Sequence, residues 1–172
     1  AALDRIAPAG TPRHFVVNTG AEAVENAMKA VLLNRVKTVG AGPLRNRATL
    51  AGNVCNASPA ADTAVALLVL EASVLVAGPS GTRSIPLAEL FVGPGQTVLT
   101  KGDLVREVGL PAAAAGFSGS YLRRSRRKGM DLATVGVLVA RRGENGSASH
   151  RLALAAVAPT PLRVREAEAL LD

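Results

Sequence analysis

The hydrophobic residues of this chain change their spacing along its length. A first helix is predicted behind Thr19-Gly-Ala-Glu22, which has the form of a capping box. Apolar residues three and four positions apart follow it, namely Val24, Ala27, Met28 and Val31. A second helix is predicted from Ser58-Pro59 to about Ala72, because serine suits the N-cap and proline the first helical position. The stretch between the helices, up to Asn56, is predicted to be a loop.

From Ser73 onward the pattern is typical of strands and turns. Ser73–Ala77 and Arg83–Pro86 are predicted to form a hairpin around a Gly-Pro-Ser-Gly turn, and Leu87–Phe91 a single helical turn. Further short apolar runs predict four more strands, at Leu104–Leu110, Ser118–Arg124, Leu132–Arg141 and Arg151–Val157. Strands therefore dominate the second half of the chain.

Turn and cap signals divide this second half. Gly143-Glu-Asn-Gly146 is a hairpin turn between the last two predicted strands. Thr160-Pro161 is predicted to begin a helix that contains Glu166 and Glu168. The alanine-rich segment from Pro111 to Gly116 is predicted to be a boundary between two parts of the fold. The fold class predicted from this succession of elements is α+β.

The composition fits a folded protein with an aliphatic core. Hydrophobic residues make up 48% and aromatic residues 2% of the 172 residues, so Val, Leu and Ala must form the core. The longest apolar run, from Ala64 to Leu70, is far shorter than the roughly 20 residues of a membrane-spanning helix. We therefore expect no membrane contact and a cytoplasmic location. The chain begins without methionine, which is typical of a fragment.

Few residues are available for metal chemistry. The chain has one cysteine, Cys55, and two histidines, His14 and His150, which are far apart in the sequence. A single thiol excludes a disulfide scaffold and a cysteine-rich iron–sulfur or zinc site within this chain. Cys55 is predicted to be a small buried thiol, because no histidine or second cysteine stands near it in the sequence to activate it. No catalytic residue and no metal ligand is predicted.

The formal charge of +7 favours an acidic partner. The densest basic run is RRSRRK, from Arg123 to Lys128. It has three interpretations: a contact to nucleic acid, a solvated or partner-facing strand, or a source of one cation that neutralises a cofactor phosphate or faces its ring. Binders of single-stranded nucleic acid place aromatic residues among the basic ones, and only Tyr121 stands near this run.

The stretch RNRATLAGNVCNASPAAD, residues 45–62, has the residue types of a pyrophosphate cradle. The small residues Ala51 and Gly52 would let backbone N–H groups approach an anion closely. The polar side chains of the same stretch are the hydroxyl of Thr49 and the amides of Asn53 and Asn56.

Two further features of the stretch fit a cofactor. The predicted helix start at Ser58 would bring its positive end close to the loop. Asp62, one turn later, could accept hydrogen bonds from a sugar or a base. The alternative is a polar connector before a capped helix, since the stretch has neither a Walker pattern nor a Rossmann glycine fingerprint.

The stretch contains a long and specific motif. It consists of Arg45-Asn46-x-Ala48-Thr49-Leu50-x-Gly52-Asn53 and then Asn56-Ala57-Ser58-Pro59-Ala60-Ala61-Asp62. It resembles the FAD-binding medium subunit of molybdenum hydroxylases, the family of carbon monoxide dehydrogenase, xanthine dehydrogenase and aldehyde oxidoreductases. Four later segments match the family in order, at Phe91–Thr97, Asp103–Pro111, Tyr121–Val135 and Ala158–Glu168. The resemblance covers roughly Val36 to Asp172.

The resemblance implies a vanillyl-alcohol-oxidase-type FAD-binding subdomain followed by a small α/β domain with an antiparallel sheet. Residues 1–112 would be the FAD-binding domain, represented by its second subdomain only, and residues 116–172 an incomplete C-terminal domain. The family's first phosphate loop, an Ala-Gly-Gly type motif, has no counterpart in residues 1–35. We therefore expect this chain to carry half of the FAD site.

The resemblance also implies a role in electron transfer. In this family a molybdenum centre hydroxylates the substrate, iron–sulfur clusters relay the electrons, and FAD passes them to an acceptor. The expected partners are an iron–sulfur small subunit and a molybdopterin large subunit, with a homodimer of the heterotrimer as a further expectation. The residues implied to contact FAD are Thr49, Leu50, Ala51, Gly52, Asn53, Asp62, Val105 and Arg123.

Two of these residues differ from the family pattern, and two other functions stay open. Ala51 stands where the family usually has glycine, and Arg123 where it often has lysine. The alternatives to a FAD-binding electron-transfer subunit are a basic nucleic-acid-binding module and a truncated, non-functional remnant of a flavoprotein.

Overall fold

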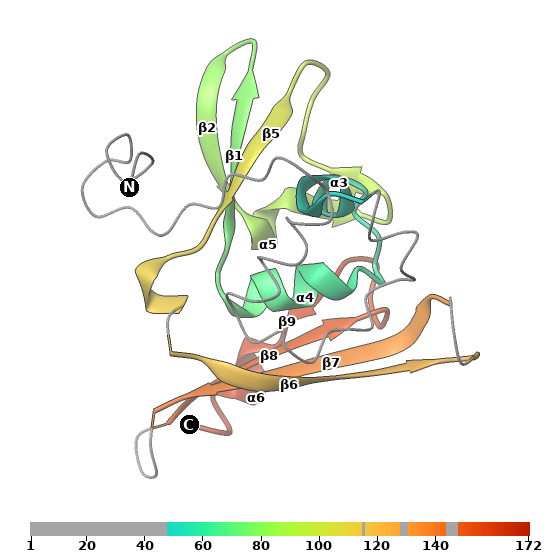
Figure 1. The fold of residues 1–172 in the computed structure, drawn as a ribbon, viewed down its shortest axis with the longest axis vertical. Coiled ribbons are helices and arrows are strands. Elements are labelled where there is room, and N and C mark those ends of the chain that lie inside the picture. The colour runs from blue at the N-terminus through green and yellow to red at the C-terminus, as the bar shows by residue number, and fades with distance from the viewer. Residues whose placement is uncertain (1–47, 115, 128–130, 144–147) are drawn as a thin grey trace.

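The computed structural model describes residues 48–114, 116–127, 131–143 and 148–172. These residues form an upper three-stranded sheet, a layer of short helices and a lower four-stranded sheet (Figure 1). The helix predicted behind Thr19 lies outside the described residues, and so does most of the predicted turn at 143–146.

The first described helix lies where a loop was predicted. Helix α3 spans Leu50–Cys55. Thr49 has extended backbone angles, φ −115° and ψ 154°, and its side chain caps the helix. Leu50 and Val54, four positions apart, turn the same face into the core, where they are 7% and 0% exposed. The prediction of a loop, made from the small and polar residues, was therefore wrong. A short helix needs only one cap and one buried pair of side chains, and this stretch supplies both.

The Ser58-Pro59 pair makes a turn and not a helix start. The Ala61 N–H donates to the Ser58 carbonyl at 3.0 Å, and the Ala60 N–H donates to Ser58 Oγ at 3.3 Å. Proline suits the second position of such a turn because its ring fixes φ. Helix α4 then begins four residues after Ser58 and spans Asp62–Val69, with Ala61 as an N-cap that has no side-chain hydrogen bond.

The upper sheet has the strand order β2-β1-β5 and is antiparallel throughout. Its strands are β1 (Ser73–Gly78), β2 (Gly81–Pro86) and β5 (Leu104–Gly109). Between β2 and β5 lie α5 (Leu87–Leu90) and the two short strands β3 (Phe91–Gly93) and β4 (Gln96–Thr97). The hairpin, the single helical turn and the strand predicted for this region are confirmed.

The lower sheet has the order β6-β7-β8-β9, and each pair of neighbours is antiparallel. Its strands are β6 (Ser118–Ser125), β7 (Ala133–Arg142), β8 (Ser149–Ala155) and β9 (Leu162–Arg163). The short 3-10 helix η3 (Ala112–Ala114) joins the two sheets. The three strands predicted for this half are confirmed, with ends that differ by one or two residues.

The last predicted helix is shorter than expected and starts later. Thr160-Pro161 does not cap it, because the chain first forms β9 against β8 and then turns at Val164, the N-cap of α6 (Arg165–Glu168). Glu168 is 7% exposed, and its carboxylate accepts bonds from the Leu152 N–H and from Arg163. These contacts hold the single helical turn against the lower sheet.

Helix α4 is buried along its whole length, from Asp62 to Val69. It packs on β7 and β8 of the lower sheet, where small side chains let it approach closely. The sheet residues of this contact that belong to the core are Leu138, Ala140, Ala153 and Ala155. The apolar core therefore continues across the segment predicted to be a boundary, although η3 marks that segment as a turn.

Within the described ranges, no helix is long and apolar enough to cross a lipid bilayer. The longest of them, α4, has eight residues.

Replacing Leu138 by alanine tests the shared core. Leu138 on β7 is 2% exposed, and Leu122 on β6 is 73% exposed. We expect Leu138→Ala to lower the free energy of unfolding by about 2–5 kcal/mol, because it leaves a cavity under α4. The matched variant Leu122→Ala should change it by less than about 0.5 kcal/mol. Urea denaturation followed by circular dichroism measures both, and equal effects would contradict the described packing.

Candidate cofactor-binding site

Thr49 and Gly52 fix the start of α3. The Gly52 N–H donates to Thr49 Oγ1 at 2.9 Å, so the hydroxyl expected to meet an anion caps the helix instead. Gly52 is exposed, and a Cβ placed on it would come within 2.7 Å of Thr49 Oγ1. Glycine here keeps the cap intact and leaves the backbone open to an approaching group.

Asn53 joins α3 to the start of α4. Its Oδ1 accepts a short hydrogen bond from the hydroxyl of Thr63 in the first turn of α4. This bond directs the amide nitrogen of Asn53 away from Thr63. Within the described residues that nitrogen has no hydrogen-bond partner, and the side chain is half-buried. Asn53 is therefore a fixed donor for an acceptor oxygen.

The turn between the two helices is held from both sides. The Gly95 N–H, from the β3–β4 turn, donates to the Ala57 carbonyl at 3.0 Å. The Ala156 N–H, just after β8, donates to the Pro59 carbonyl at 2.8 Å. Ala57 and Ala156 both have positive φ, at 48° and 63°. These bonds attach the turn that precedes Asp62 to the β3–β4 turn and to the end of β8.

Asp62 is the centre of a buried polar cluster. One carboxylate oxygen accepts a short hydrogen bond from the hydroxyl of Tyr121, and the other accepts from Arg123 Nη1 at 2.7 Å. The side chains of Asp62 and Arg123 are 7% and 14% exposed. Arg123 Nη2 also donates to the Asp131 carbonyl at 2.7 Å. The cluster joins the first turn of α4 to strand β6, about 60 residues away in sequence.

Gly136 and Asp131 support the cluster from β7 and its approach. A Cβ on Gly136 would collide with the hydroxyl of Tyr121, so glycine gives the ring its room. The Asp131 carboxylate accepts from the N–H groups of Arg127 and Leu132 at 3.1 and 2.9 Å. Burial raises the pKa of Asp131, but these bonds and the nearby arginines outweigh it and leave the pKa lowered. Asp131 thus holds the turn that precedes β7.

The environment of Tyr121 raises the pKa of its phenol above the ordinary 10.0. Burial is the largest cause, and the hydrogen bond to Asp62 and its negative charge add to it. Arg123 acts in the opposite direction. The phenol therefore stays protonated and donates to Asp62 at neutral pH.

Comparison with known proteins assigns the chain to a family. The family described as the FAD binding domain in molybdopterin dehydrogenase matches residues 16–113. This chain belongs to that family. The match covers α3, the turn and α4, and it starts well before Val36, where the recognisable resemblance begins. The family match therefore extends the resemblance back to residue 16.

Several relatives of the FAD-binding family are similar to this chain. A xanthine dehydrogenase FAD-binding subunit of Escherichia coli O157:H7 is 35% identical over 131 residues, which cover 74% of this chain and 45% of that protein. The carbon monoxide dehydrogenase medium chain of Hydrogenophaga pseudoflava is 33% identical over 154 residues, covering 84% and 53%. This chain spans about half the length of the relatives it matches.

Solved structures of the family have the same fold. Carbon monoxide dehydrogenase from Hydrogenophaga pseudoflava, in a form that lacks the Mo-pyranopterin moiety, superposes with a TM-score of 0.79 at 32% identity. The match covers 90% of this chain and 55% of that one. Reconstituted carbon monoxide dehydrogenase from Oligotropha carboxidovorans gives 0.79 at 25% identity, over 91% and 56%. The predicted α+β fold class, with its antiparallel C-terminal sheet, is confirmed.

The structure brings together most of the residues predicted to contact FAD. Thr49, Leu50, Ala51, Gly52 and Asn53 form the cap and first turns of α3. Asp62 and Arg123 lie in the cluster described above, linked to α3 through Thr63 and Asn53. Val105 lies half-buried on β5, the strand that packs beside α3. Leu50 differs from the others because its side chain points into the core, so it can offer a ligand only its backbone.

Ala51 fits the site without the glycine that the FAD-binding family usually has. It lies inside α3 and has no positive φ. An alanine methyl is therefore tolerated by the backbone at this position.

Sequence reasoning missed two members of the cluster, Thr63 and Tyr121. Tyr121 and Arg123 are two positions apart on a predicted strand, so their side chains share a face. That alternation was the available signal for Tyr121. No sequence pattern indicates the bond between Thr63 and Asn53, because it forms only when the turn between α3 and α4 brings the two residues together.

The basic run begins on β6 with Arg123 and Arg124 and continues beyond the end of the strand. Arg123 points inward to Asp62, whereas Arg124, Arg126 and Arg127 are exposed. Within the described part of the run, Arg123 is therefore paired inside the fold and only the other three arginines face outward. Cys55, predicted to be buried, is only half-buried, and burial raises the pKa of its thiol.

No group of three or more His, Cys, Asp or Glu side chains able to hold a metal ion is found in the described part of the chain.

An alkaline titration tests the Asp62–Tyr121 contact. Tyr121 is the only tyrosine and the chain has no tryptophan, so absorbance at the phenolate band reports this residue alone. We expect ionisation of the native protein well above pH 10.0, and ionisation of the urea-unfolded protein near 10.0. Because the folded pKa is the higher one, stability is fully present below pH 10.0 and is lost as the pH rises above it.

The variant Asp62→Asn is the control for the cause of this shift. It removes the negative charge that faces the phenol, so the native pKa should fall toward the unfolded value while remaining raised by burial. A native wild-type titration that coincides with the unfolded one would contradict the described cluster.

Proposed function

We propose that this chain is the FAD-binding, electron-transfer part of a molybdenum hydroxylase. The observation that carries the proposal is the linked arrangement of α3, α4 and β6 through Asn53, Thr63, Asp62 and Arg123. It supports a cofactor site because residues distant in sequence meet there within a chain of the FAD-binding family. Bound FAD would supply two-electron redox chemistry, because it can accept two electrons and pass them on.

The residues present fit the diphosphate and flavin ends of such a cofactor. At the diphosphate end, Gly52 leaves the backbone open and the Asn53 amide nitrogen is an available donor. Thr49 would act by keeping α3 capped. At the other end, Asp62 can accept a hydrogen bond, and Arg123 supplies a positive charge beside it. Val105 would give apolar contact from β5.

Other subunits would supply the rest of the electron path. The relatives are named as a medium chain and a FAD-binding subunit, which supports a role as one part of a larger enzyme. We propose an iron–sulfur small subunit and a molybdopterin large subunit as partners, with the heterotrimer forming a homodimer in the cytoplasm. We also propose residues 1–112 as the FAD-binding domain and residues 116–172 as part of the C-terminal domain.

Titration with FAD tests this function. Saturable quenching of flavin fluorescence is expected when the 172-residue chain is mixed with FAD, alone or with its iron–sulfur and molybdopterin partner chains. The absence of saturable binding under both conditions would contradict the proposal.

Asn53→Asp is the variant that assigns the diphosphate end. It keeps the oxygen that accepts from Thr63 and replaces the donor nitrogen by a negative charge, so FAD affinity should fall about tenfold or more. The matched variant Gln96→Glu makes the same change at an exposed position on β4 and should leave FAD affinity unchanged. Equal losses in both variants would mean that the effect is only one of net charge.

A further inference from the structure

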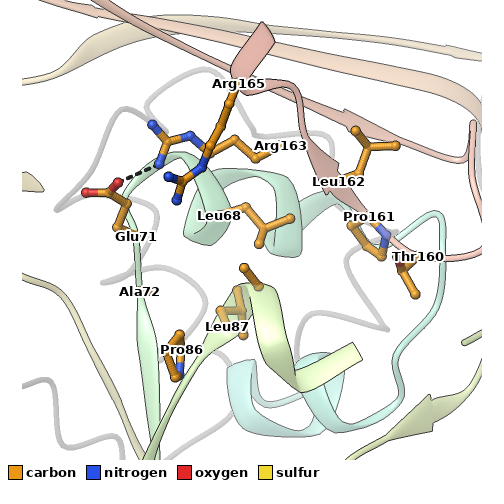
Figure 2. Close-up of a pocket in the computed structure, with 11 residues that line it drawn as sticks. Leu68, Glu71, Ala72, Pro86, Leu87, Thr160, Pro161, Leu162, Arg163 and Arg165 are labelled. Carbon is orange, nitrogen blue, oxygen red and sulfur yellow. Dashed lines mark hydrogen bonds and ion pairs between the residues drawn. The ribbon is translucent and has the colours of Figure 1, made fainter. Parts of the chain in front are cut away.

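A cavity lies at the end of α4 opposite Asp62. Figure 2 shows it between the end of α4, the junction of β2 with α5, and the segment from Thr160 to Arg165. Its volume is about 380 Å³, within the range of small-molecule sites in proteins. Helix α4 has eight residues, so the cavity and Asp62 are separated by roughly 12 Å along its axis.

The walls of this cavity are apolar. Leu68 and Ala72 come from α4 and its end, Leu87 from α5, and Pro161 and Leu162 from the segment before and within β9. Leu68, Ala72 and Leu87 are 4%, 2% and 0% exposed, so they form a buried floor behind the cavity. The apolar surface that a ligand can reach comes from Pro86, Ala88 and Leu162, in front of this floor.

The rim of the cavity carries charge. Glu71 accepts from Arg163 Nη1 at 2.7 Å and from Arg151 Nη2 at 2.8 Å, so both of its oxygens are bonded to arginines. Arg163 is further paired with Glu168 through Nε and Nη2. Burial would raise the pKa of Glu71, but these arginines outweigh it and keep the carboxyl ionised.

Arg165 is the exception among the charged groups of the rim. Among the described residues its guanidinium donates no hydrogen bond, although its charge helps to lower the pKa of Glu71, and the residue is exposed. Three arginines and two glutamates meet here, so one positive charge is in excess. A guanidinium that donates no hydrogen bond beside an apolar cavity favours a carboxylate, which it can bind through two parallel hydrogen bonds.

We propose that this cavity binds a small organic carboxylate with a compact apolar body. The apolar part lies against Pro86, Ala88 and Leu162, and the carboxylate meets Arg165 at the rim. The site uses none of the residues assigned to FAD, so the proposal does not depend on FAD binding.

Benzoate is the probe for this site, with benzamide as its uncharged counterpart of the same shape. Calorimetry at low salt with the whole chain should give saturable benzoate binding, with Kd about 1 mM or tighter. Benzamide should bind at least tenfold more weakly, because it cannot form the charged pair. No benzoate binding, or equal binding of both compounds, would overturn the proposal.

Matched variants locate the binding. Arg165→Gln should weaken benzoate about tenfold, whereas Arg124→Gln removes the same charge from an exposed position on β6 and should have no effect. Ala88→Leu, at an exposed position that lines the cavity, should fill the space and abolish binding of both compounds. Equal weakening by the two arginine variants, or unchanged binding in Ala88→Leu, would overturn the proposed location.

Discussion

The complete burial of α4 is the constraint on which the rest of the structure depends. A helix surrounded by apolar side chains still has unpaired backbone groups at its ends, and those ends must find partners inside the protein. At the first turn, Asp62 binds Tyr121 and Arg123 of β6. At the last, the Val69 carbonyl accepts from Arg151 of β8 at 2.7 Å. The lower sheet thus holds the first turn through the Asp62 side chain and satisfies a backbone carbonyl at the last turn.

This arrangement explains why the candidate cofactor site belongs to both halves of the fold. The residues on α3 reach Asp62 through the bond between Asn53 and Thr63, and Asp62 reaches β6 through Arg123. Arg151 contributes at the opposite end, where it also stacks on the Phe117 ring at 4.2 Å. A change in the lower sheet would therefore alter the position of groups that lie near the upper one.

The strands were predictable and the short helices were not, for physical reasons. Alternating burial gives a strand a signal over six or more residues, as in β6 and β7. Helix α3 has six residues and a single buried pair, too few for a helical period. Ser58-Pro59 fits a turn as well as a helix start, and only the tertiary bonds to Gly95 and Ala156 distinguish them. Asp62 and Arg123 were both predicted to contact FAD, but their contact with each other was not predicted. A local sequence pattern carries no information about partners that are distant in the sequence.

The position of the basic run at the margin of the lower sheet has a consequence for solubility. In the part of the chain that the structure describes, β6 has a neighbouring strand on one side only. Its other side presents main-chain groups that a strand of another molecule could join. Arg124 projects from this strand, with Arg126 and Arg127 exposed just beyond it. If the β6 edges of two molecules came together, their arginines would repel each other. The basic run therefore discourages edge-to-edge association of the lower sheet.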